Sequence, residues 1–160
     1  MVTQNRHDLL DVIKRNYKSL ERPDFSFVSR AISSKAYDAL IKNLRDLFDV
    51  EEITDSNDDV SFRYVVSKSN NQWIVELSML GRYATVLRVL QPGQTELVSQ
   101  NTSAPEDKDI ISLLLENQFE ILGKDKLEQP VALKLFNTEP ENTCIYQALF
   151  SDIDVLPWKV

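Results

Sequence analysis

The sequence contains one cysteine, one histidine and three glycines in 160 residues, and this scarcity excludes several kinds of site. A lone cysteine, Cys144, cannot form a disulfide within the chain, which agrees with a reducing compartment. One histidine and one cysteine cannot supply the usual ligands of a zinc site. No nucleophile motif surrounds His7 or Cys144, so no catalytic residue is predicted.

The chain also lacks long apolar runs and glycine-rich loops. Each of Gly81, Gly93 and Gly123 fits a turn or a helix end, so no phosphate-binding loop and no cofactor are expected. No stretch approaches the roughly 18 apolar residues of a transmembrane helix. The first residues lack the apolar core of a signal peptide. We therefore expect a cytoplasmic protein with no membrane partner.

Negative charge dominates, and it is unevenly distributed. The formal net charge is −7. Residues 1–48 hold nine Lys/Arg against six Asp/Glu, whereas residues 49–160 hold nine against nineteen. Such a field repels phosphates and argues against nucleic-acid binding. It is compatible with a basic protein partner, although an acidic surface also serves solubility alone.

A run of strands from Val60 to Ser99 carries the clearest pattern in the sequence. Apolar residues occupy even positions in 60–66 and odd positions in 73–79, as in two half-buried strands. A two-residue loop at Asn70–Asn71 would pair Val66 with Val75, Tyr64 with Leu77 and Phe62 with Met79. The sequence thus predicts a β-hairpin with one apolar face.

Two further strands are predicted after this hairpin. Residues 83–90 are apolar on both faces, which is expected where a helix covers part of the outer face. Gln91-Pro-Gly-Gln94 is typical of a type II turn, and Thr95 to Ser99 would form a more polar strand near the sheet edge. On the face opposite the helices, we expect an exposed polar surface of Ser61, Arg63, Ser67, Glu76 and Ser78.

Helical patterns flank the strands. Asn5 can cap a helix that Pro23 ends, and Ser33 or Ser34 can cap a second helix reaching Phe48. A third helix is predicted from a capping box of Ser103 and Glu106 to Gly123. Two segments are less regular: 24–32 fits either a short strand or an extended linker, and a short strand is expected around 50–54.

The sequence of the C-terminal part predicts a last β-hairpin, formed by residues 130–136 and 144–150. The fold class is therefore α+β: two N-terminal helices, an antiparallel meander of four to five strands, one helix and a C-terminal hairpin, with the helices packed on the sheet. We expect a single domain over 1–160 with a short flexible tail at about 1–5. The order helix, three strands, helix, two strands resembles that of type III secretion chaperones, although this chain has an extra N-terminal helix and lacks the C-terminal one.

Few residues stand out as a candidate site. The acidic turn with Asp55, Asp58 and Asp59 begins like a calcium loop, but Val60 replaces its glycine and Val66 its bidentate glutamate, so no metal is predicted. Arg63, Glu76 and Arg88 are the remaining candidate binding residues. Trp73 and Tyr83 are candidates for a ligand pocket, although inward-facing aromatic residues are more often core.

These observations favour a non-enzymatic, acidic protein-binding module of the inhibitor, immunity-protein or chaperone-like kind, with a basic protein as partner and a homodimer possible. The alternative is a small-molecule-binding domain with an apolar pocket between sheet and helices. An enzyme using carboxylates and an arginine would need a cleft with converging polar groups.

Overall fold

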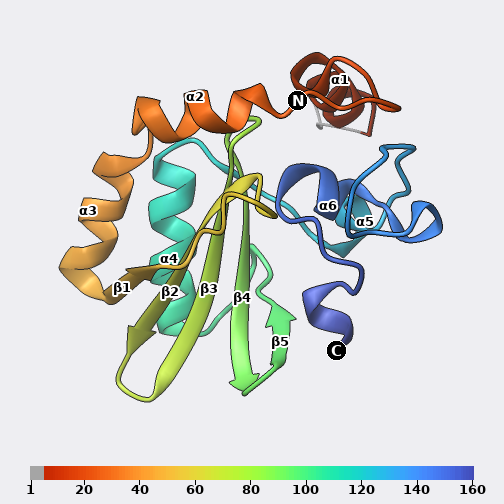
Figure 1. Cartoon of the computed structure of the whole chain (residues 1–160). Coiled ribbons are helices and arrows are strands. Elements are labelled where there is room, and N and C mark those ends of the chain that lie inside the picture. Colours follow the sequence, from red (N-terminus) through yellow and green to blue (C-terminus); the bar gives the residue numbers. More distant parts are fainter. Residues whose placement is uncertain (1–5) are drawn as a thin grey trace.

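The computed structural model describes residues 6–160 and shows a mixed α+β fold, which confirms the predicted class (Figure 1). The predicted N-terminal tail lies outside the described residues. The helices are α1 (Arg6–Tyr17), α2 (Ser26–Ser34), α3 (Asp38–Leu47), α4 (Pro105–Glu116), α5 (Lys124–Leu127) and α6 (Ile145–Leu149), with 3-10 turns η1 (Pro140–Asn142) and η2 (Pro157–Lys159). No helix among these residues is long and apolar enough to cross a membrane.

The strands form one mixed sheet. They are β1 (Asp49–Glu52), β2 (Ser61–Lys68), β3 (Asn71–Ser78), β4 (Tyr83–Gln91), β5 (Gln94–Leu97) and β6 (Glu120–Ile121). The first five follow one another in antiparallel pairs, as a meander requires, and Gly93 has the positive φ of 80° that the predicted turn needs. The sixth strand, which the sequence did not predict, pairs with β4 in parallel.

The β2–β3 hairpin has a register displaced by two residues from the predicted one. Val66 pairs with Trp73 and Tyr64 with Val75, because the loop is Ser69–Asn70 and Ser69 takes the positive φ of 55°. A displacement of two residues leaves every side chain on its expected face. The apolar face is therefore as predicted, although the individual pairs are wrong.

The segment 24–32, expected to be a strand or a linker, contains helix α2. Asp24 provides the missed start signal, because its Oδ1 accepts the amide N–H of Ser26 at 2.8 Å. Hydrogen bonds from Ser26, and to a smaller extent the contact with Lys18, lower the pKa of Asp24 to about 2. The preceding helix ends at Tyr17, well before Pro23, since Lys18 adopts a φ of 67°. Lys35, with a φ of 52°, separates α2 from α3.

The C-terminal part differs most from the prediction. Helix α4 begins without a side-chain cap at Ala104, so the expected capping box is wrong, and it ends at Glu116 because Gln118 turns the chain with a φ of 67°. The predicted last hairpin is reduced to an isolated bridge between Pro130 and Cys144. Residues 145–149 are helical, since Gln147 accepts the amide N–H of Cys144 and thereby caps α6. The element order therefore does not end in the two strands on which the resemblance to secretion chaperones partly rested.

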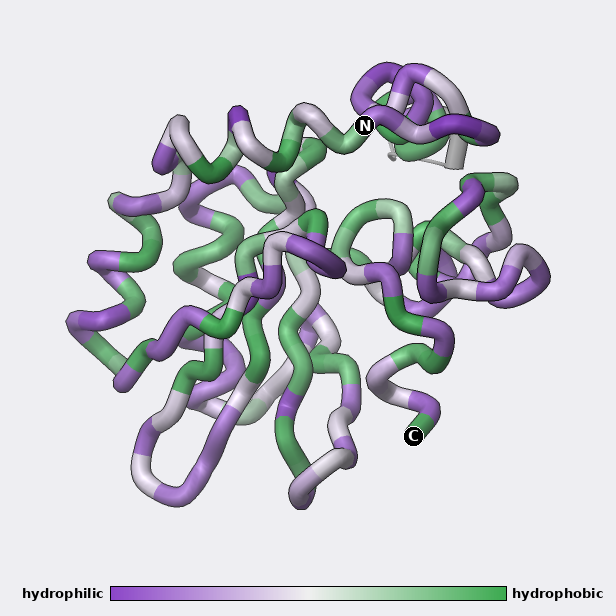
Figure 2. Tube along the Cα trace, in the orientation of Figure 1, coloured by the Kyte–Doolittle hydropathy of each residue, from purple (hydrophilic) through white to green (hydrophobic). Residues whose placement is uncertain are grey.

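Both faces of the sheet are covered over part of their area. Helices α3 and α4 pack on one face around Trp73, Val75 and Leu77, whereas α6 packs on the other with Tyr146 and Phe150. In Figure 2 the middle parts of the strands are hydrophobic and the β2–β3 loop is hydrophilic.

The predicted exposed polar surface is instead largely an interior layer. Ser61, Glu76 and Ser78 have no solvent exposure, and the Ser61 hydroxyl donates to the carbonyl of Phe150 at 2.8 Å. Phe150, directly after helix α6, thus lies over Ser61, and Tyr146 of α6 lies over Glu76. Sequence alternation identified the face correctly, but it could not show that a distant segment covers it.

Candidate functional site

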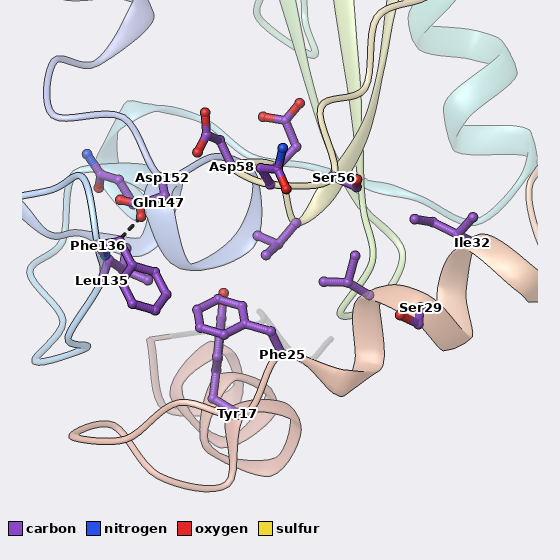
Figure 3. A pocket seen from close by; sticks show the side chains of 14 residues that line it. Tyr17, Phe25, Ser29, Ile32, Ser56, Asp58, Leu135, Phe136, Gln147 and Asp152 are labelled. Carbon is purple, nitrogen blue, oxygen red and sulfur yellow. Dashed lines mark hydrogen bonds between the residues drawn. The ribbon is translucent and has the colours of Figure 1, made fainter.

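A cavity of about 400 Å³ lies where α1 and α2 approach the acidic turn and the C-terminal segment (Figure 3). We call it the acidic cavity. Its apolar lining includes Tyr17, Phe25, Val28, Ile32, Val60, Leu135 and Phe136. Three carboxylates line it as well, those of Asp58, Asp59 and Asp152. In Figure 3 Phe136 lies next to Asp152, with a hydrogen bond between them, and Tyr17 and Phe25 lie below the carboxylates of Asp58 and Asp152.

The acidic turn is held in place by its own carboxylates. Asp55 Oδ1 accepts the amide N–H of Asn57 at 3.0 Å, and Asp59 Oδ2 accepts the amide N–H of Asp55 at 2.8 Å. Asp59 Oδ1 also accepts the hydroxyl of Ser151 at 2.7 Å, which ties the turn to the C-terminal segment. Of the three predicted acidic binding residues, Asp58 and Asp59 line the cavity. Asp55 is not among the lining residues and stabilises the turn through its hydrogen bond with Asn57.

Asp152 organises the segment beside the acidic turn, and its amide N–H donates to the Asp58 carbonyl at 2.9 Å. Its Oδ2 accepts the amide N–H groups of Phe136 and Asn137, each at 3.0 Å, and its Oδ1 accepts the hydroxyl of Thr138 at 2.6 Å. Asn137 in turn donates its side-chain amide to Asp58 at 2.9 Å. The backbone of Phe136 is thereby fixed beside the two carboxylates.

Aromatic rings form the other wall of the acidic cavity. The Phe136 side chain is 86% exposed, and its ring lies 6.0 Å from that of Phe25. Tyr17 contacts Phe25 edge-on at 5.5 Å and donates its hydroxyl to the Ala148 carbonyl at 2.7 Å. Burial, and to a smaller extent the charge of Asp152, raise the pKa of Tyr17 far above its usual range. Tyr17 is thus a fixed neutral wall, whereas Phe136 is free to meet a partner.

The negative charge of the cavity is only partly neutralised. Arg63 Nη1 lies 3.8 Å from Asp59 Oδ2. Within the described part of the chain, no lysine or arginine lies within 4.0 Å of the carboxylates of Asp58 or Asp152. Carboxylates opposite aromatic rings suit a group with a positive charge and an apolar body, such as a guanidinium or ammonium side chain.

The loop after Phe136 depends on a further carboxylate. Asp154 Oδ1 accepts the amide N–H of Glu139 and the side-chain amide of Asn142, both at 3.0 Å, and these bonds lower the pKa of Asp154. A lowered pKa stabilises the fold above the ordinary pKa, and that contribution is lost as the pH falls through the lowered value.

We therefore expect Asp154→Asn to unfold at lower urea concentration than the wild type at neutral pH. The difference should disappear under acid conditions, where Asp154 is protonated in both the folded and the unfolded wild type. Urea unfolding at a series of pH values measures it. A deficit independent of pH would show that the charge of Asp154 is not what stabilises this loop.

A second group of predicted residues meets inside the fold rather than at its surface. Glu76 has no solvent exposure; its Oε2 accepts from Arg63 Nε at 2.8 Å, and its Oε1 accepts from Thr85 Oγ1 at 2.7 Å. The Tyr146 hydroxyl lies within 3.0 Å of both carboxylate oxygens. Burial raises the pKa of Glu76 and that of Tyr146, while Arg63 opposes the rise at Glu76. We call this group the Glu76 cluster; it connects α6 to the sheet.

Arg88 belongs to a third polar group, on the face covered by α4. It forms ion pairs with Glu96 and Asp107, and Asp107 also accepts the indole N–H of Trp73 at 2.8 Å. Trp73 and Tyr83 are 2% and 6% exposed, and neither borders any cavity described for this chain. The structure therefore places both aromatic residues in the core.

Sequence reasoning missed the aromatic wall and Asp152. Tyr17, Phe25, Phe136 and Asp152 come from segments far apart in the chain, and none belongs to a motif. Among the side chains that the structure describes, those of residues 8–160, no group of Cys, Asp and Glu is arranged to hold a metal ion. Comparisons with known proteins found no match: no family model, no curated protein and no solved structure matches the chain.

Proposed function

We propose that the chain is a non-enzymatic, acidic binding module that recognises a basic protein partner through the acidic cavity. One observation carries the proposal: the 86% exposed side chain of Phe136 lines the same cavity as the carboxylates of Asp58 and Asp152, and among the described residues no lysine or arginine lies within 4.0 Å of these two carboxylates. The net charge of −7 supports it, since a complementary field accelerates association with a basic partner and disfavours nucleic acid.

The chemistry of the cavity favours an arginine or lysine of the partner as the central contact. The aliphatic stem of such a side chain packs against the rings, and its charge reaches the carboxylates. Burying an exposed phenylalanine contributes about 1.5–3 kcal/mol, which is typical of an interface hot spot. The proposal names no catalytic residue.

Affinity capture from the native host tests this proposal with matched variants. Phe136→Ala and Asp58→Asn change exposed or half-exposed groups, so the fold should tolerate them within about 0.5 kcal/mol. We expect the wild type to retain a basic protein that both variants lose. With the purified partner, Phe136→Ala should weaken binding about ten-fold or more, and Asp58→Asn about two- to five-fold.

Val155→Ala is the control, because Val155 is 55% exposed and borders a different cavity. It should retain the same protein as the wild type. If Phe136→Ala and Asp58→Asn capture the same proteins as the wild type and the control, the acidic cavity is not the recognition site.

A small organic cation is the second candidate ligand. The cavity volume of about 400 Å³ lies in the range of small-molecule sites. This site differs from the ligand pocket predicted from the sequence, because that pocket was placed at Trp73 and Tyr83 and both residues are buried. A thermal-shift screen with agmatine, choline and free arginine tests it: a concentration-dependent rise in Tm that Phe136→Ala abolishes supports the small ligand, and no rise excludes these probes.

A further inference from the structure

A second cavity, also of about 400 Å³, lies on the other side of helix α2's C-terminal end. Tyr37, Phe62 and Tyr64 form its apolar lining, and Asp38 and Glu52 its acidic groups. Lys35 is its one basic residue. The cavity therefore repeats the combination of aromatic rings and carboxylates found in the acidic cavity.

The two cavities adjoin each other. Ile32 of α2 and Ser56 of the acidic turn border both of them. Ile32 is 43% exposed although it is large and apolar, so it forms a ridge between the two hollows. We call the combined feature the α2 groove; it extends from Phe136 and Asp58, past Ile32, to Glu52 and Tyr64.

The far end of the α2 groove is negatively charged as well. The charges of Glu52 and Asp38 act on Tyr64: after burial, which has the larger effect, they raise the pKa of its hydroxyl. Within the described residues, no lysine or arginine lies within 4.0 Å of either carboxylate. Both ends of the groove thus carry carboxylates that no lysine or arginine of the described residues approaches within 4.0 Å, although Lys35 borders the far end and Arg45 opposes the rise in the pKa of Tyr64. The ridge between the two ends is apolar.

We propose that the α2 groove binds a segment of the basic partner in which an apolar residue lies between two cationic residues. One cation occupies the acidic cavity beside Asp58, the apolar side chain covers Ile32, and the second cation pairs with Glu52. This inference rests on the proposed function and extends it, because it gives the order of residues that the partner must present. Charge complementarity at both ends and the exposed Ile32 between them identify this occupant.

Synthetic peptides provide the test without knowledge of the partner. One series carries two arginines separated by a leucine-centred spacer of varied length, and the reference series replaces the second arginine by glutamine. Binding to the full chain is measured by fluorescence anisotropy at low salt. For the best spacing, we expect the two-arginine peptide to bind about five-fold more tightly than its reference.

Glu52→Gln separates the groove from the acidic cavity alone. It should weaken the two-arginine peptide about two- to five-fold and leave the reference peptide unchanged. Glu51→Gln is the matched control, because β1 pairs Glu51 with Val65 and Glu52 with Tyr64, which places the two carboxylates on opposite faces of the sheet. Asp58→Asn should weaken both peptides.

The outcomes distinguish the two proposals. If Asp58→Asn weakens binding but Glu52→Gln has no more effect than Glu51→Gln at any spacing, the groove proposal is overturned and the proposed function stands. If neither series binds the wild type, or if Asp58→Asn changes nothing, the acidic cavity does not recognise basic segments and both proposals fail.

Discussion

Replacing Arg63 by methionine is expected to lower the free energy of unfolding by about 3–5 kcal/mol, because it leaves the carboxylate of Glu76 buried without a cation. Glu76 has no solvent exposure, and Arg63 Nε donates to it at 2.8 Å. Burial alone would lower the pKa of Arg63, but Glu76, Tyr146 and Asp59 outweigh burial and raise it. The charged state of the arginine therefore belongs to the native fold, and urea unfolding measures its loss.

The double variant Arg63→Met with Glu76→Gln is the control for this prediction. It should recover a large part of the stability, since a neutral amide costs less to bury than an unpaired carboxylate.

The pH dependence of stability provides a second test of the Arg63–Glu76 ion pair. Burial raises the pKa of Glu76, and removal of Arg63 takes away the charge that opposes the rise. A carboxyl with a raised pKa contributes most stability below its ordinary pKa, and this contribution is lost as the pH rises through the raised value. The deficit of Arg63→Met should therefore shrink as the pH falls. A single variant no less stable than the wild type, or a double variant no better than the single one, would contradict the assigned role of the pair.

Asp107→Ala is the second substitution with a large expected effect. Asp107 is 1% exposed and accepts the indole N–H of Trp73 at 2.8 Å and the hydroxyl of Thr102 at 3.0 Å, in addition to its ion pair with Arg88. Its removal leaves the buried indole N–H of Trp73 without its acceptor and leaves Arg88 with Glu96 as its remaining ion-pair partner. We expect a loss of about 2–4 kcal/mol in the free energy of unfolding.

Asp109→Asn is the matched control on the same helix, because Asp109 is exposed. Its effect should stay within about 0.5 kcal/mol. Equal stabilities for the two variants would show that the contacts of Asp107 do not stabilise the packing of α4 against Trp73.

Local patterns predicted the parts of the fold that depend on local physics. Alternation identified β2, β3 and β4 and their apolar face, and Pro92-Gly93 identified the turn before β5. The register of the β2–β3 hairpin was wrong because either Ser69 or an asparagine can take the positive φ of the loop, and the choice depends on small energy differences. Such alternatives differ by two residues and leave the same hydrophobic pattern.

The errors concentrate where the tertiary structure decides the outcome. An apolar run such as 144–150 fits a buried strand or a buried helix equally well, and here the Gln147 cap and the packing over the sheet favour helix α6. Because α6 was not foreseen, Glu76 and Ser61 were expected at the surface.

The candidate site was only half visible in the sequence. The acidic turn of Asp55, Asp58 and Asp59 stood out by composition, and the structure brings two of these residues to the cavity. Phe136 and Asp152 lie beside the turn because their chain neighbours Asn137 and Ser151 donate hydrogen bonds to Asp58 and Asp59, which are 79 and 92 positions away in sequence. No local pattern encodes such contacts.

The most direct test of the recognition proposal is a ¹H–¹⁵N chemical-shift map of the chain titrated with the two-arginine peptide. We predict that the largest shifts cluster at residues 56–59 and at Phe136 and Asn137, and that Phe136→Ala requires about ten-fold or more peptide to produce the same shifts at residues 56–59. Shifts centred instead on the sheet face of Val65, Ile74 and Val89, or no saturable shifts at all, would contradict it.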